Sequence, residues 1–255
     1  MKDQLVERLW LRSFGADRNV KVTVSRAGET VSLSVSLIGR DDFIHSMSSL
    51  PRSGSRWIDD DILYLDLATA DYEDVLRFMI KRTERQTVIF DIRDGCRFDL
   101  ANVLFLLAGA DRLSELPRKG ILNVPQVIYP ATPVIQDTLK DLPVPEPDSQ
   151  NIFLIGPSNY SNYEYVIDCV RYMGLGLLVG ADTGGCNGII NRIVLPSGES
   201  ARFTGMKVLS NIGRSHYYFM KGIHPDIAVD YDLQDIAEGN DTVLVTAIGI
   251  ADSAI

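Results

Sequence analysis

Ser161 and Glu164 are the residues whose types and spacing point most directly to chemistry. They lie between an apolar segment, Asn151–Ile155, and a segment with helical spacing, Tyr163–Met173. A serine in the first turn of a helix lies beside main-chain N–H groups that have no partner, at the positive end of the helix dipole. That position favours a nucleophile whose acyl adduct carries an oxyanion. The same Ser-x-x-Glu spacing is also typical of a helix capping box, which is the alternative interpretation.

Two further segments carry polar groups or glycines directly after apolar runs. The run Thr87–Ile92 continues into Arg93, and ligands bind beyond the carboxyl ends of strands in open α/β sheets. Arg93 is therefore a candidate site residue, although a buried Asp–Arg pair that fixes a turn would have the same sequence. The glycine-rich loop 180–188 follows an apolar segment as well. It lacks Walker spacing, so we do not expect it to hold a phosphate.

The order of the apolar segments predicts an α/β fold with parallel strand pairing. Continuous apolar runs predict buried strands at Ile62–Leu67, Thr87–Ile92, Asn151–Ile155 and Leu177–Gly180. Helical spacing predicts helices at Leu5–Arg12, Tyr72–Lys81, Leu100–Ala108, Tyr163–Met173 and Val243–Ile250. Alternation in Val20–Val24 and Val31–Leu37 predicts a hairpin. We therefore divide the chain into a small helix–hairpin segment (1–40), a linker (41–57) and an α/β core (58–255).

Composition and charge exclude several classes of function. The chain has 255 residues, 45% of them hydrophobic, and a formal net charge of −9. An acidic chain lacks the basic surface that general nucleic-acid binding needs, so we expect no nucleic-acid partner. The longest uncharged apolar run, Ala101–Ala110, is far shorter than the roughly 20 residues of a membrane span, so we expect no such span. The three cysteines and three histidines form no metal-ligand pattern, and we expect neither a metal nor another cofactor.

Six short motifs follow one another between residues 87 and 229. They are D-I-R at the strand end, Ser-x-x-Glu, G-x-x-T-x-G, L-P-x-G, T-G-M and G-I-x-P-D-I-x-V. In this order they resemble the S41 family of serine peptidases, also called tail-specific or C-terminal processing peptidases, and the resemblance extends from Ile58 to Ile250. Two segments, Thr183–Gly188 and Thr204–Val208, are most similar to a bacterial subgroup of that family. The resemblance implies a crotonase/ClpP-like α/β core preceded by a partial PDZ-like segment, and cleavage of peptide bonds near protein C-termini through a serine acyl-enzyme.

The resemblance also implies roles for particular residues. Ser161 falls at the nucleophile position, and the main-chain N–H groups of Asn162 and Gly95 would hold the oxyanion. The residues that would line the site are Asp66, Arg93, Glu164, Thr183, Cys186 and Asn187. Arg97 and Phe98 stand where the family has the glycines that shape the oxyanion hole.

The base is the clearest departure from the family pattern. The lysine that serves as the base in many members would fall at position 186, which is Cys186 here. A thiol is a poor substitute for a desolvated lysine, so we expect another base. The early strand, where another branch of the family has a histidine, offers Asp66 instead. We prefer His216 as the base, and the other candidates are His224, Lys207, Lys221 and Asp66.

Two functions from different classes stay open. The first is an active serine peptidase with a non-lysine base, acting on peptides or protein C-termini. The second is a catalytically impaired member of the family that binds peptides or serves as an interaction module. An acyl-CoA enzyme on a shared crotonase-like core is a third, minor alternative. Members of the family are commonly exported to the periplasm or cell envelope, whereas Met1–Arg8 lacks the apolar core of a signal peptide. The sequence does not define the oligomeric state.

Overall fold

The computed structural model describes residues 19–26, 28–36, 54–83, 86–114, 121–122, 148, 150–188, 190–204, 207–208, 210 and 218–254. The chain divides into two units, Met1–Ser53 and Gly54–Ile255. No helix within the described ranges is long and apolar enough to cross a membrane.

The first unit contains the predicted hairpin. Strands β1 (Asn19–Arg26) and β2 (Glu29–Ser36) pair antiparallel, and Arg26 lies opposite Glu29 at the turn. Because side chains alternate along a strand, one face of the hairpin is apolar; it carries Val20, Val22, Val24, Val31, Leu33 and Val35. The helix predicted at Leu5–Arg12 lies outside the described residues, so the PDZ-like character of this segment stays a prediction.

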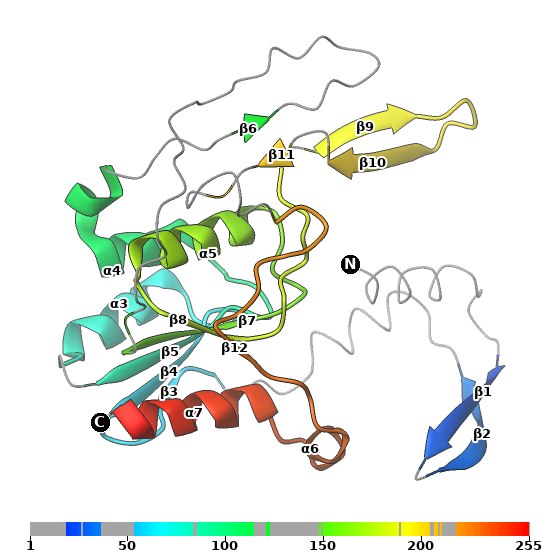
Figure 1. The fold of residues 1–255 in the computed structure, drawn as a ribbon, viewed down its shortest axis with the longest axis horizontal. Helices are drawn as coiled ribbons and strands as arrows, with labels where there is room; N and C mark the ends of the chain where they lie inside the picture. Colours follow the sequence, from blue (N-terminus) through cyan, green and yellow to red (C-terminus); the bar gives the residue numbers. More distant parts are fainter. Residues whose placement is uncertain are drawn as a thin grey trace. The chain divides into compact units, whose positions relative to one another are not determined.

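The second unit is built on a six-stranded sheet with the order β12-β8-β7-β5-β4-β3 (Figure 1). Its strands are β3 (Arg56–Trp57), β4 (Ile62–Asp66), β5 (Thr87–Asp91), β7 (Asn151–Ile155), β8 (Leu177–Gly180) and β12 (Ile227–Ala228). Neighbouring strands are parallel except β3 and β4. Every residue of β4, β5 and β7 is buried, as their continuous apolar sequences predict. Strand β3 lies inside the range that was expected to be a linker (41–57), and the second unit begins at Gly54.

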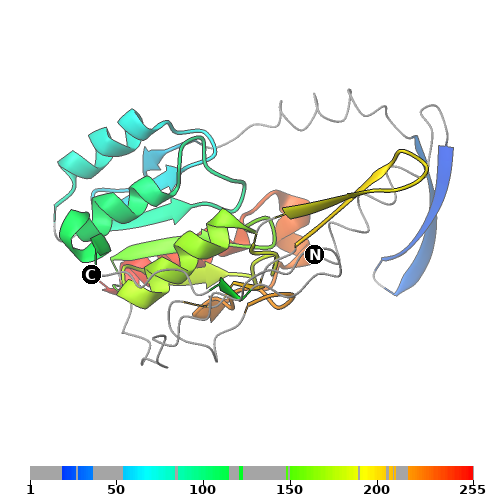
Figure 2. The same cartoon turned by 90° about the horizontal axis from the view of Figure 1, so that it is seen from above.

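Helices cover both faces of this sheet (Figures 1 and 2). They are α3 (Tyr72–Lys81), α4 (Ala101–Ser114) and α5 (Asn162–Met173) on one face, and α7 (Thr242–Ala254) on the other. Alternate strand residues face the two layers. Phe90 and Phe153 stack at 4.8 Å between ring centroids in the core that includes α5 residues. Ile89 and Leu154 belong instead to the core that includes α7 residues.

The remaining elements lie outside this sheet. Strands β9 (Ile190–Val194) and β10 (Ser200–Thr204) form an antiparallel hairpin, and β6 (Ile121–Leu122) pairs with β11 (Lys207–Val208). A short helix, α6 (Leu233–Glu238), precedes α7. The carboxyl ends of the parallel strands β4, β5, β7 and β8 meet at one edge of the six-stranded sheet, and the predicted site residues follow these ends.

Candidate active site

Ser161 lies in the turn that joins the end of β7 to the start of α5. Its backbone has φ 60° and ψ −117°, and Met220 is the only other non-glycine residue with positive φ in the part of the chain that the structure describes. Such a conformation costs of order 1–3 kcal/mol, and these conformations cluster at functional sites. The Ser161 side chain makes no capping hydrogen bond and is partly exposed. The hydroxyl is therefore presented at the first turn of α5 and is not used to cap the helix.

Asn159, which is 0% exposed, holds this turn against the end of β5. Its side chain accepts a hydrogen bond from the Gly156 N–H at 2.9 Å and donates one to the Ile92 carbonyl at 2.6 Å. Its own carbonyl accepts from the Gly184 N–H at 2.8 Å. Sequence reasoning did not find this residue. The available signal was an asparagine in a Gly-Pro-Ser-Asn turn, where such side chains often bond to the backbone.

Glu164 joins the start of α5 to the glycine-rich loop 181–188. One carboxylate oxygen accepts from the Thr183 hydroxyl and the Gly185 N–H, both at 2.7 Å, and the other accepts from the Cys186 N–H at 2.9 Å. A further hydrogen bond comes from the Ser161 main chain. The capping-box interpretation is therefore correct for the glutamate and wrong for the serine hydroxyl, since the carboxylate binds the helix start while the hydroxyl does not.

Burial dominates the electrostatics of Glu164, which is 1% exposed. Burial raises the pKa of this carboxyl, because the charged form is poorly solvated. The hydrogen bonds from Thr183, Gly185, Cys186 and Ser161 lower the pKa but do not outweigh burial. The side chain is thus an internal anchor that fixes the loop beside Ser161.

The glycine-rich loop is also interlocked with residues 218–223. The Thr183 hydroxyl accepts from the Ile223 N–H at 2.7 Å while donating to Glu164, and the Met220 N–H donates to the Gly185 carbonyl at 2.7 Å. A Cβ on Gly222, which has φ +80°, would overlap the Thr183 carbonyl, so this close approach requires glycine. The loop therefore holds three predicted site residues in one place: buried Thr183 and the partly exposed Cys186 and Asn187.

Arg93, which is predicted to line the site, makes ion pairs within the protein. Its guanidinium forms a paired contact with Asp91, at 3.0 and 2.6 Å, and another with Asp241, at 2.8 and 2.5 Å. Tyr64 also donates to Asp91 at 2.9 Å. The alternative interpretation, a buried Asp–Arg pair that fixes a turn, is the one that the structure supports.

Asp66, which is predicted to line the site and is a candidate base, is the last residue of β4. It is 7% exposed, and its carboxylate accepts from the Ala68 N–H at 3.1 Å within the turn after β4. Asp66 lies two residues after Tyr64, which packs in the α7 core, so the alternation of the strand directs it away from the face that α5 covers.

The turn 95–98 uses its main-chain N–H groups internally. Gly95, with φ +107°, donates to the Ile92 carbonyl at 3.1 Å, so its predicted role as an oxyanion donor disagrees with this geometry. The Cys96 N–H donates to the Tyr163 hydroxyl at 2.7 Å, and the Arg97 N–H donates to the Leu67 carbonyl at 3.0 Å. The Phe98 main chain hydrogen-bonds the Cys96 thiol, whose pKa burial raises to about 11. Asn162, the other predicted donor, is the first residue of α5, where an N–H has no acceptor within the helix.

The structure describes the side chains of some candidate bases and not of others. His216 lies outside the described residues, and so does the side chain of Lys207. Lys221 is exposed. The His224 ring, 73% exposed, contacts Asp182 at 2.6 Å between Nδ1 and Oδ1.

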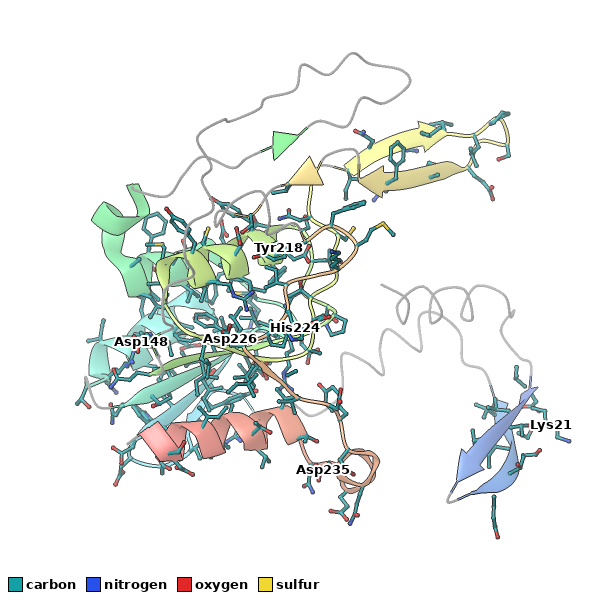
Figure 3. The ribbon with its side chains drawn as sticks, viewed as in Figure 1. Lys21, Asp148, Tyr218, His224, Asp226 and Asp235 are labelled. Atoms are coloured by element: carbon teal, nitrogen blue, oxygen red, sulfur yellow. The ribbon has the colours of Figure 1, made fainter. Side chains whose placement is uncertain are left out.

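Asp226 is the aspartate of the last motif, G-I-x-P-D-I-x-V, and its contacts explain its place in that motif. Figure 3 labels Asp226, Tyr218 and His224 along the segment that leads into β12. The Asp226 carboxylate accepts from the Leu178 N–H at 2.8 Å and from Arg171 of α5 at 3.0 Å. It thereby ties this segment to both the sheet and the helix that follows Ser161. The prediction gave Asp226 no role.

Solved structures provide the first comparison with known proteins. A protein from Parabacteroides merdae ATCC 43184 is 22% identical, with a TM-score of 0.48; the match covers 86% of this chain and 72% of that one. Mature CPAF complexed with lactacystin is 14% identical, with a TM-score of 0.52 and coverage of 94% and 69%. The photosystem II D1 C-terminal processing protease is 18% identical, with a TM-score of 0.40 and coverage of 89% and 61%. The likeness to CPAF supports a shared fold.

Sequence comparison gives a family match for part of the chain. A search of curated proteins finds no match. Residues 113–229 match the model of peptidase family S41, and this range includes Ser161, Glu164 and the loop 181–188. The match confirms the predicted resemblance to peptidase family S41 over this part of the chain.

Proposed function

We propose that the chain is a serine peptidase that cleaves peptide bonds through an acyl-enzyme on Ser161. The observation that carries the proposal is the backbone of Ser161, at φ 60° and ψ −117°, with a hydroxyl that caps nothing. Strained strand-to-helix turns expose nucleophilic serines in other hydrolases. The N-terminus of a helix also stabilises negative charge. The family match supplies the reaction class.

In the proposed reaction, the Ser161 oxygen forms a bond with the carbonyl carbon of the scissile peptide while its proton passes to a base. The electron pair of the carbonyl π bond moves to the carbonyl oxygen, which becomes the oxyanion. Collapse of this intermediate breaks the C–N bond, and the leaving amine takes the proton from the base. Water then hydrolyses the acyl-enzyme through the same steps. The Asn162 N–H would be one donor to the oxyanion.

His216 stays our preferred base. A histidine suits this role because its ordinary pKa lies close to neutral pH. The alternatives have less support: the His224 ring is exposed and paired with Asp182, and Asp66 is used by its own turn.

The family resemblance supports finer proposals about substrate and location. We propose peptides or protein C-termini as substrates, an exported location in the periplasm or cell envelope, a crotonase/ClpP-like core and a PDZ-like first unit. The β1–β2 hairpin has an apolar face, and a two-stranded hairpin alone is at best marginally stable in water.

A catalytically impaired peptide-binding protein is the second candidate function. The observation that favours it is the turn 95–98, in which the N–H groups of Gly95, Cys96 and Arg97 already have partners within the protein. If no other donor replaces them, an oxyanion at Ser161 would have few hydrogen-bond donors beyond the Asn162 N–H.

Reaction with a fluorophosphonate probe tests the proposal. We expect the probe to label Ser161, and we expect Ser161→Ala to abolish labelling. Ser158→Ala is the matched control because Ser158 is an exposed serine on the same turn; this variant should be labelled like the wild type. A folded wild-type protein that takes up no label at any tested pH would favour the binding protein instead.

A further inference from the structure

Three main-chain N–H groups of the turn 95–98, those of Gly95, Cys96 and Arg97, already have acceptors, and a side-chain hydroxyl lies directly on this turn. The N–H groups of Gly95, Cys96 and Arg97 donate to the Ile92 carbonyl, the Tyr163 hydroxyl and the Leu67 carbonyl, respectively. Tyr163 lies two residues after Ser161 in the same first turn of α5. We propose that the Tyr163 hydroxyl, in place of these three N–H groups, donates a hydrogen bond to the oxyanion formed at Ser161. This inference rests on the proposed peptidase function.

The hydrogen-bonding state of Tyr163 supports this role. Its oxygen accepts the Cys96 N–H at 2.7 Å, and a tyrosine hydroxyl that accepts one hydrogen bond still has its own proton to donate. Among the residues that the structure describes, no group accepts that proton. Within the described part of the chain, the hydroxyl is therefore oriented by the bond it accepts and keeps its proton for an oxyanion, as an oxyanion donor requires.

The Gly95 backbone and the Tyr163 ring fix where this hydroxyl lies. A Cβ built on Gly95 would be 3.4 Å from the Tyr163 oxygen, which is van der Waals contact, so the phenol lies against the backbone of this turn. The ring itself packs against the core on the α5 face of the sheet. The position is thus set by packing on one side and by the Cys96 hydrogen bond on the other, so little reorganisation is needed when charge develops.

The environment of the phenol keeps its proton in place at neutral pH. Burial raises the pKa of Tyr163, and the Cys96 hydrogen bond opposes that rise without reversing it. The titratable groups that act on the phenol are the Cys96 thiol and the Tyr160 phenol. The Cys96 N–H also polarises the hydroxyl that it binds, which strengthens the bond that the hydroxyl can donate.

The variant Tyr163→Phe tests the proposal because it keeps the ring and removes only the hydroxyl. We expect its rate of fluorophosphonate labelling, and its kcat on a peptide substrate, to fall by about 100-fold or more with little change in KM. Tyr172→Phe, at the other end of α5, is the matched control and should react like the wild type.

An unchanged rate in folded Tyr163→Phe would overturn the proposal. A faster rate would overturn it as well, because it would mean that Tyr163 blocks the Cys96 N–H in the resting enzyme. A wild-type protein that reacts at Ser161 separates these outcomes from a failure of the proposed function, whereas a wild type that never reacts would overturn both.

A second variant keeps the test valid if Tyr163→Phe does not fold. A fluorinated tyrosine at position 163 has the same shape but a more acidic phenol, so its proton is lost at lower pH. We expect the upper pH limit of labelling to move down relative to the wild type, which a purely structural tyrosine would not cause. An unmoved pH profile would contradict the proposal.

Discussion

Ser161 and Met220, the two non-glycine residues with positive φ among those described, belong to one hydrogen-bonded assembly. Glu164 binds the main chain of Ser161 and the Gly185 N–H, and the Gly185 carbonyl accepts from Met220. Strained conformations persist only where the surroundings fix them. The two strained residues therefore belong to the same site, and Glu164 joins the start of α5 to the loop that Met220 contacts.

The strain at Ser161 predicts an unusual order of stability between two variants. Ser161→Gly and Ser161→Ala both lack the hydroxyl, but only glycine adopts φ 60° without strain. We expect Ser161→Gly to be more stable than Ser161→Ala by about 1 kcal/mol, measured by urea unfolding. At Ser158, where φ is not positive, the order should reverse. Equal stability of the two Ser161 variants would show that the turn stores no strain.

At the scale of elements, the sequence predicts the strands better than the contacts of the site. Strands β5 and β7 are recognisable because their apolar runs are continuous, and α3 because its apolar residues recur at helical spacing. The contacts that build the site join residues far apart in the chain: Glu164 and Thr183 are 19 apart, and Cys96 and Tyr163 are 67 apart. Such pairs depend on which strands are neighbours, and no local pattern encodes that.

The link from Glu164 to the glycine-rich loop predicts a loss of stability in Glu164→Gln. The amide has nearly the same shape, but its NH₂ group would face a donor, either the Thr183 hydroxyl or a main-chain N–H. An unsatisfied buried donor costs about 1–3 kcal/mol, so we expect a loss of about 2 kcal/mol in the free energy of unfolding. The raised pKa of Glu164 also sets how this stability difference changes with pH. Because its pKa is higher in the folded state, the folded state holds the carboxyl proton more tightly than the unfolded state.

The stability advantage of the wild type over Glu164→Gln should therefore be largest below the ordinary carboxyl pKa. It should decline as pH rises through the raised folded pKa. Urea unfolding of both proteins across this pH range measures the difference directly. An advantage that instead grows with rising pH would mean that Glu164 is better stabilised as the charged form than its burial indicates.

At the scale of the whole second unit, Arg93 is the residue that joins the sheet to the last helix. It contacts Asp91 at the end of β5 and Asp241 at the start of α7, which is 148 residues away in the chain. Asp241 also accepts from the Leu244 N–H at 3.1 Å, so it caps α7 as well. The edge of the sheet that carries the site is thus tied to the helix on the opposite face from α5.

This junction predicts that Asp241→Asn will weaken the second unit without removing the helix cap, since asparagine also caps helices. Burial alone would raise the pKa of Asp241, but the hydrogen bonds and charge of Arg93 outweigh it and leave the pKa lowered. A lowered folded pKa stabilises the protein above the unfolded pKa, and this contribution is lost as pH falls through the folded pKa. The Asp241 side chain is 36% exposed, so solvent screening reduces the effect, and we expect a loss of about 2 kcal/mol at neutral pH. The difference in the free energy of unfolding between Asp241→Asn and the wild type should shrink in acid.

The control is Asp252→Asn, on the exposed part of α7, which should stay within about 0.5 kcal/mol of the wild type at every pH. If the two variants unfold alike at neutral pH, Arg93 does not hold α7 to the sheet edge.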